Sequence, residues 1–196
     1  MRKIVALLGS GVAEGNTERL LQQVVCGAEG AGCFVETFCI PKMNISPCVQ
    51  SYGCMFENRC MIDDDANTII QKLKTCDGII IASPIMTYGI PGSLKCFMDR
   101  CQAFYFAQKN GAPLVKPELA KRRRTLFISI SGMGTGDVFD GAKATVKAWC
   151  SIVSSEYFDE LLQNDMDTIG RIENKPGLCE TAFEKGKKLG EELARS

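Results

Sequence analysis

The sequence predicts a three-layer α/β sandwich of the doubly wound kind, with a five-stranded parallel sheet between helices. Short β-rich runs alternate with longer segments of helical period along the whole chain. The run at residues 79–82 is apolar on both faces, as expected for a parallel strand that is covered by helices on both sides. No fixed-period repeat, low-complexity segment or linker divides the 196 residues. We therefore expect a single domain over residues 1–196.

The elements follow from the local patterns. Strands are expected at residues 3–9, 34–40, 78–83 and 125–131, with a weaker fifth near 155–162. Helices are expected at residues 16–30, 64–75, 92–104, 138–151 and 181–194. In the first helix, Leu20, Leu21 and Val24 form one apolar stripe. Two connections, 41–63 and 105–124, are long enough to indicate functional loops or interfaces.

Composition excludes several kinds of function. Lys+Arg 23 are balanced by Asp+Glu 23, so the chain lacks the basic excess of a dedicated nucleic-acid binder. Histidine is absent, which excludes an imidazole base, a Ser–His–Asp triad and a His-ligated metal. No apolar run approaches the roughly 18 residues of a membrane span. We therefore expect no nucleic-acid or membrane partner, and chemistry that uses a cofactor, a thiol, a carboxylate or the backbone.

The cysteine content indicates a reducing compartment. The chain has 11 cysteines, an odd number, and the apolar stretch after Lys3 is shorter than the roughly seven residues of a signal-peptide core. Mostly free thiols in the cytoplasm are therefore expected. Small buried hydrophobes are expected at the cysteines within strand or helix patterns: Cys26, Cys33, Cys39, Cys76, Cys96, Cys101, Cys150 and Cys179.

The loop after the first strand has the features of an anion site, because ligands bind beyond the C-terminal strand ends in such sheets. Its glycine spacing is not a dinucleotide fingerprint, and no lysine follows Gly15 as in a Walker A loop. The donors that would surround an anion are backbone N–H groups near Gly11 and Gly15 and the side chains of Ser10, Asn16 and Thr17. They suit a permanently held phosphate monoester, such as that of flavin mononucleotide (FMN). An ordinary capped strand-to-helix turn is the alternative.

Two further loops are expected at the same edge. After the third strand, two prolines and two glycines in residues 83–92 give a rigid crest, where Met86 and Tyr88 can lie along a flat ring. After the fourth strand, three glycines in residues 131–137 let the backbone approach a planar ligand closely. Each loop alone is an ordinary turn. Together with the first loop, which adjoins them in this topology, they predict a ligand site.

These residues resemble the NAD(P)H-dependent FMN reductases of flavodoxin-like fold. The likeness is carried by Gly9-Ser10 with Gly15-Asn16-Thr17 and by the run from Ser83-Pro84 through Leu94-Lys95 to Asp99-Arg100, and it covers almost the whole chain. It implies an FMN phosphate on Ser10, Asn16 and Thr17. It also implies contacts to the flavin ring and ribityl chain from Pro84, Ile85, Met86, Thr87, Gly89, Ser131, Gly132 and Gly134.

The connection after the second strand resembles the cluster loop of iron–sulfur flavoproteins, a branch of the same superfamily. Their motif, C-x2-C-x2-C-x5-C, binds a 4Fe–4S cluster, and Cys48, Cys54 and Cys60 match its first, third and fourth positions. Ser51 stands at the second position, where a thiolate is the usual ligand. Zinc would also want a fourth ligand. The alternatives are a cluster on three thiolates, a loop that has lost its metal, and structural thiols or a redox-active disulfide.

Two other features have plainer explanations. The basic run at residues 121–124 suggests a solvated turn before a strand, rather than a site for nucleic acid or an NADP phosphate. The aromatic residues Phe104, Tyr105 and Phe106 suit an aromatic wall, a subunit contact or core packing equally.

The leading functional hypothesis is a cytoplasmic oxidoreductase that passes electrons from NAD(P)H or a reduced carrier through FMN to an acceptor such as a flavin, a quinone or an oxygen species. Hydride transfer to a flavin needs no protein acid or base, which fits the missing histidine. A non-enzymatic iron–sulfur electron carrier served by a ferredoxin-like protein is the alternative, and a metal-binding regulatory module is a third. A homodimer or homotetramer is expected from the resemblance.

Overall fold

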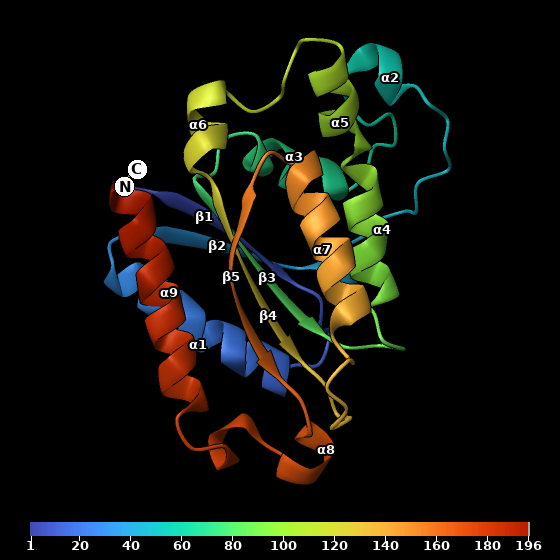
Figure 1. Ribbon diagram of the computed structural model, residues 1–196. Helices are drawn as coiled ribbons and strands as arrows, with labels where there is room; N and C mark the ends of the chain where they lie inside the picture. The colour runs from blue at the N-terminus through green and yellow to red at the C-terminus, as the bar shows by residue number, and fades with distance from the viewer. Residues whose placement is uncertain (196) are drawn as a thin grey trace.

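The computed structural model describes residues 1–195 and confirms the predicted flavodoxin-like sandwich around one parallel sheet (Figure 1). The strands are β1 (Lys3–Leu8), β2 (Phe34–Cys39), β3 (Gly78–Pro84), β4 (Arg124–Ile130) and β5 (Glu156–Gln163). Their order is β2-β1-β3-β4-β5, with every neighbouring pair parallel. The chain order reverses between β1 and β3, and the carboxyl ends of these strands flank the switch point at which such sheets bind ligands.

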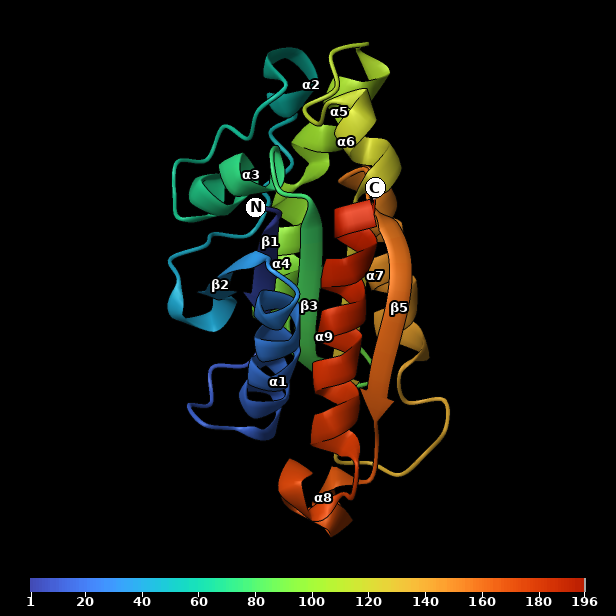
Figure 2. The ribbon, with the colours of Figure 1, turned by 90° about the vertical axis from the view of Figure 1, so that its left-hand side faces the viewer.

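Helices cover both faces of the sheet (Figures 1 and 2). One face packs against α1 (Asn16–Gly30) and α9 (Leu178–Arg195), and the other against α3 (Ala66–Leu73), α4 (Gly92–Arg100) and α7 (Asp140–Ile152). The first core includes Ile80 and Leu189, and the second includes Ile81, Leu94 and Trp149. Successive residues of β3, such as Ile80 and Ile81, therefore lie in different cores, which explains why β3 is apolar on both faces. None of the described helices is long and apolar enough to cross a membrane.

Short helices lie where loops were expected. They are α2 (Cys54–Glu57), α5 (Gln102–Lys109), α6 (Pro117–Arg122), α8 (Met166–Ile169) and the 3₁₀ turns η1 (Ile40–Lys42) and η2 (Ile172–Asn174). The single helix predicted at residues 92–104 is two, α4 and α5, joined at Cys101. The N–H of Cys101 donates to Met98 O, a tighter i→i−3 contact that redirects the chain. Apolar periodicity continues across this joint, so the sequence pattern does not reveal it.

Two predictions about local environment are wrong in part. Within the basic run at residues 121–124, Arg123 is fully buried rather than solvated. Its guanidinium donates to the carbonyl oxygens of Cys76 (3.1 Å), Val153 (2.8 Å) and Leu73. Of the cysteines expected to be buried, Cys33, Cys76, Cys101 and Cys150 are buried, Cys39, Cys96 and Cys179 are half-buried, and Cys26 is exposed. A thiol is small and weakly polar, so one helical position says little about its burial.

Candidate functional site

The sheet order brings the three predicted loops to one edge, because β1, β3 and β4 are neighbours. The N–H of Gly9 donates to Ala82 O (2.7 Å), and the N–H of Ile85 donates to Ile130 O (2.9 Å). The first two loops therefore begin where their strands are still hydrogen-bonded to the neighbouring strand of the sheet. A Cβ on Gly9 would lie 3.0 Å from Leu94 Cδ2, so glycine at this position allows the first loop to pass close to α4.

The first loop ends in an open helix start. Gly15 is the N-cap of α1 in extended conformation, and no side chain caps the helix. The first-turn N–H groups of α1 are therefore not occupied by a cap and carry the positive end of the helix dipole. Ser10 and Thr17 are both buried beside this start, and the Ser10 hydroxyl accepts a hydrogen bond from the N–H of Val12 (3.3 Å). Such a start can bind an anion.

The side chain of Asn16 points to a loop that the sequence analysis did not include. Its Nδ2 donates to Gly170 O (2.7 Å), and its Oδ1 accepts from the N–H of Ile172 (3.2 Å). Arg171 in the same loop donates to the backbone oxygen of Glu14 (3.3 Å). In this arrangement Asn16 contributes its backbone N–H to the helix start, while its amide fastens the loop after β5 to the loop after β1.

The second loop is a small hairpin. Met86 and Gly89 exchange backbone hydrogen bonds of 2.8 and 3.0 Å, and Thr87 and Tyr88 between them have φ values of +50° and +60°. Two left-handed central residues are the mark of a type I′ turn. A Cβ on Gly141 would lie 2.5 Å from Tyr88 O, so the hairpin rests directly on the first turn of α7. The shape of the crest is therefore set by Thr87 and Tyr88 rather than by glycine.

The third loop is held by the loop after β5. The N–H groups of Met166 and Asp167 donate to the oxygens of Ser131 and Gly132 at 3.0 and 3.2 Å. A Cβ on Gly132 would lie 2.4 Å from Asp167 Oδ1. We expected glycine here to make room for a ligand, whereas the nearest neighbour is this carboxylate. Turn residues after the fifth strand were the available signal for this missed loop, since every strand of a parallel sheet ends at the same edge.

Exposed apolar side chains gather on these three loops. Val12, Met86, Tyr88 and Met133 all belong to the exposed large hydrophobic residues of the chain. Apolar surface clustered beside backbone donors is typical of a site for an apolar ring that carries a polar or anionic group. The residues present therefore fit FMN, with the uncapped helix start for its phosphate and the crest for its ring.

The three motif cysteines line one cavity of about 420 Å³. Ser51 lines it too, so all four motif positions face the same space, together with Lys95, Arg100 and Phe106 from α4 and α5. Burial raises the pKa of the Cys54 thiol, and the nearby thiols of Cys60 and Cys48 raise it further. Of the aromatic trio, Phe104 is buried in the core, Tyr105 is partly exposed, and Phe106 is at this cavity.

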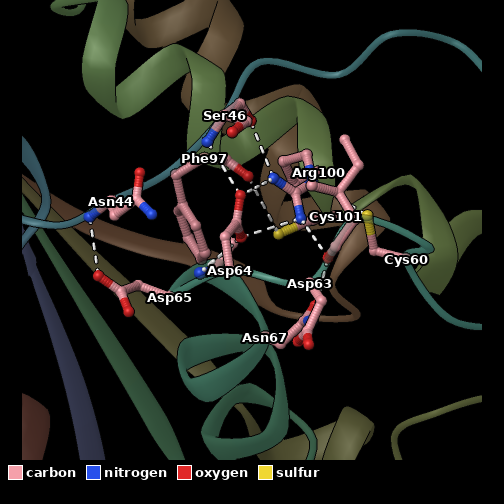
Figure 3. A network of polar contacts seen from close by, with 12 residues as sticks. Asn44, Ser46, Cys60, Asp63, Asp64, Asp65, Asn67, Phe97, Arg100 and Cys101 are labelled. Carbon is pink, nitrogen blue, oxygen red and sulfur yellow. Dashed lines mark hydrogen bonds and ion pairs between the residues drawn. The ribbon is translucent and has the colours of Figure 1, made fainter.

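A buried arginine, Arg100, holds the cysteine loop by polar contacts (Figure 3). Arg100 is 1% exposed and makes a two-pronged ion pair with Asp64, at 2.6 and 3.0 Å. It also donates to the backbone oxygens of Ser46 (2.8 Å) and Ile62 (2.9 Å). Its Nε is 2.9 Å from Cys60 Sγ. The guanidinium thus ties both ends of the loop to α4, a role the motif alone did not assign.

This donor set lacks the fourth thiolate of the usual four-iron cluster. Such a cluster takes four cysteine thiolates, and the second position here is Ser51. The thiol at the fourth motif position, Cys60, faces a guanidinium donor. Within residues 1–195, no three Cys, Asp or Glu side chains are arranged to hold a metal ion.

Comparison with known proteins gives relatives of the expected kind. An iron–sulfur flavoprotein of Methanocaldococcus jannaschii is 34% identical over 98 residues, which is 50% of this chain and 51% of the relative. A flavone reductase superposes with a TM-score of 0.72 at 17% identity, over 98% of this chain and 63% of that one. An FMN-dependent NADH-azoreductase from Bacillus anthracis, solved with FMN, gives a TM-score of 0.69 at 14% identity, over 97% of this chain and 100% of that one.

The chain spans about half the length of the first curated relative that it matches. At these identities the solved structures establish the fold alone. The family model described as NADPH-dependent FMN reductase matches residues 2–140, which include all three loops and end at the first residue of α7. By the match over most of its length, this chain belongs to the NADPH-dependent FMN reductase family.

Proposed function

We propose that this protein is an FMN-dependent oxidoreductase that takes electrons from NAD(P)H and passes them to a small-molecule acceptor. The observation that carries the proposal is the meeting of three loops at the switch point, with an uncapped helix start on one and exposed apolar side chains on all three. Family membership and a relative described as FMN-dependent support the same cofactor.

The roles of the chain's own groups follow from their placement. The first-turn N–H groups of α1, with the hydroxyls of Ser10 and Thr17, would hold the phosphate. The crest of residues 84–89 and the backbone of residues 131–134 would hold the ring and exclude water from one side of it. When bound, FMN supplies the redox chemistry, while the protein supplies binding and orientation.

The alternative of an iron–sulfur electron carrier is less well supported. It needs a cluster near the flavin, and the cysteine loop lacks the fourth thiolate. In Figure 1, α2 lies at the end of the molecule away from the arrowheads of β3 and β4, and Figure 2 again shows it far from the end of β3. A direct path from this loop to an FMN on the same chain therefore has little support. A ferredoxin-like partner and a homodimer or homotetramer stay predictions.

The test combines flavin content with turnover. Purified protein is loaded with FMN, freed of excess by gel filtration, and examined by its visible spectrum and by steady-state oxidation of NADH and NADPH with a quinone or free flavin as acceptor. We expect a flavin spectrum and turnover with one of the two nucleotides. Thr17→Val should lower flavin content, whereas Thr145→Val at a half-buried position on α7 should not. Equal flavin content in both variants would move the phosphate site elsewhere.

A further inference from the structure

The three cysteines of the 41–63 connection form a second site that the flavin chemistry does not use. They share one cavity of about 420 Å³ although they are spread over thirteen residues of chain, Cys48 to Cys60. The other described cysteines are placed within the strands, helices and turns of the sandwich, and all eleven are free thiols. Free thiols that line one surface cavity can be reached by small reagents, so the cavity suits thiol chemistry.

Local geometry brings together the backbone segments that carry two of these thiols. Cys54 opens α2, and Asn58 ends it in a left-handed conformation with φ +50°, which turns the chain back. A Cβ on Gly53 would lie 2.5 Å from Met61 Cγ, so the segments that flank the turn are in contact. Cys54 and Cys60 are the next residues inward from this contact on each side. Closing the short loop between them costs little chain entropy.

Arg100 places a positive charge next to one of the two sulfurs, that of Cys60. Its Nε is 2.9 Å from Cys60 Sγ, while its other nitrogens are fixed by Asp64 and by backbone oxygens. The guanidinium is 1% exposed and therefore stays in place. A fixed cationic donor stabilises negative charge on a sulfur that attacks, or leaves, in disulfide exchange.

We propose that Cys54 and Cys60 form a reversible intrachain disulfide, with Cys60 as the sulfur that first reacts with a low-molecular-weight disulfide. In the first step, Cys60 sulfur bonds to one sulfur of the small disulfide, whose S–S bond breaks and releases one thiol. In the second step, Cys54 sulfur displaces the remaining half and releases a second thiol. The protein loses two hydrogens and two electrons, and the small disulfide gains both as two thiols.

The choice of partner follows from exposure and distance along the chain. Cys48 is exposed and lies before the two left-handed residues Gln50 and Tyr52, whereas Cys54 shares a turn with Cys60. Ser51, at the remaining motif position, cannot form a disulfide. The site is thus a dithiol at the third and fourth motif positions, and it is independent of whether FMN binds at the other end of the sheet.

The experiment uses a trypsin cleavage site that lies between the two cysteines and puts them on different peptides. Arg59 lies between them, so trypsin yields peptide 43–59, with Cys48 and Cys54, and peptide 60–72, with Cys60. The full chain is equilibrated in mixtures of reduced and oxidised glutathione, quenched with acid, alkylated, digested without reductant and analysed by mass spectrometry. An equal mixture of ¹⁵N-labelled and unlabelled protein distinguishes links within a chain from links between chains.

We expect a linked 43–59/60–72 pair that increases with the oxidised fraction, carries one isotope only and disappears on reduction. Cys48→Ser and the exposed control Cys26→Ser should retain the pair, and Cys54→Ser should lose it. Retention in Cys54→Ser, mixed-isotope pairs, or no pair in fully oxidised glutathione would each overturn the proposal. So would anaerobic reconstitution that loads the wild type with iron and sulfide but leaves Cys60→Ser without them. Each readout is a peptide mass or an iron content, so failure of the flavin function would not affect it.

Discussion

Arg123 caps two helices from inside the core. Its guanidinium donates to Leu73 and Cys76 at the end of α3 and to Val153 just after α7. These carbonyls lie at helix C-termini, where backbone oxygens lack helical partners and a cation is favoured. Burial lowers the pKa of Arg123, and its guanidinium donates hydrogen bonds to carbonyl oxygens rather than to a carboxylate. The carbonyl oxygens therefore carry most of its stabilisation.

We expect Arg123→Met to lower the free energy of unfolding by about 3 kcal/mol, because it leaves several buried carbonyls without donors. Urea unfolding followed by circular dichroism measures the change. Arg59→Met is the matched control, since that side chain is 61% exposed and its ion pair with Glu57 is long at 3.8 Å. A loss below about 0.5 kcal/mol at Arg123, the usual range of surface substitutions, would contradict its capping role.

Asp64 makes the cysteine loop sensitive to acid. Burial by itself would raise the pKa of this carboxyl, but hydrogen bonds from Arg100 and from the N–H groups of Ser46 and Ala66 outweigh it, so the pKa is lowered. A carboxyl whose folded pKa lies below its unfolded value of about 4 stabilises the protein above that pH. The contribution is lost as the pH falls from there through the folded pKa.

Unfolding free energies at pH 7 and pH 3 measure this contribution in the wild type and in Asp64→Asn. We expect the wild type to lose more stability than the variant between the two pH values, because the variant has already lost the charge. Asp159, Glu160 and Glu173 also have lowered pKa values and are common to both proteins. An identical loss in both would show that the Asp64 carboxyl does not contribute.

At the scale of elements, the hairpin after β3 tests the ring site. Thr87 has φ +50°, a conformation that glycine adopts freely and proline cannot. We expect Thr87→Gly to keep FMN and Thr87→Pro to lose it, while both retain a cooperative unfolding transition because the loop is at the surface. Fluorescence titration of the apoprotein with FMN gives the affinities. Equal affinity in the two variants would exclude the hairpin from the site.

The packing of α1 on α9 depends on two glycines. A Cβ on Gly186 would lie 1.9 Å from Val24 O, and a Cβ on Gly27 would lie 2.0 Å from Phe183 O. The two backbones therefore touch, and no side chain can move aside to make room. We expect Gly186→Ala to cost about 3 kcal/mol or more, at the upper end of the usual range for overpacking.

The control for this packing is Gly30→Ala at the last residue of α1, where a Cβ meets nothing within 4 Å. That change should be neutral or slightly stabilising, because alanine is the better helix former. Thermal unfolding of both variants makes the comparison. A tolerated alanine at residue 186 would mean that the helices can separate without loss.

At the scale of the whole molecule, the site joins segments that are far apart in the chain. We expect FMN to slow amide hydrogen exchange in residues 10–17, 84–91 and 131–137 together, and to leave the outer face of α9 unchanged. At a hundredfold excess over its dissociation constant, the cofactor should stabilise the fold by about 2.7 kcal/mol. Exchange measured by mass spectrometry would contradict a shared site if only one loop responded.

Much of this arrangement could be predicted from the sequence. The boundaries of α1 match the prediction, since Leu20, Leu21 and Val24 recur at helical spacing and all face one core. Continuous apolar runs indicated central parallel strands, and the doubly wound topology placed the loops after β1, β3 and β4 at one edge. These features depend on local periodicity and on connection rules, both of which are present in the chain itself.

Only the tertiary structure decided the contacts between residues that are distant in sequence. The burial of Arg123, the Arg100–Asp64 pair beneath Cys60, and the fastening of Asn16 to the loop after β5 have no local signature. A side chain's burial and partners depend on what the rest of the chain folds against it. The pattern of Cys48, Cys54 and Cys60 thus determined where the thiols would gather, whereas the position of Arg100 on α4 decided which sulfur meets the guanidinium.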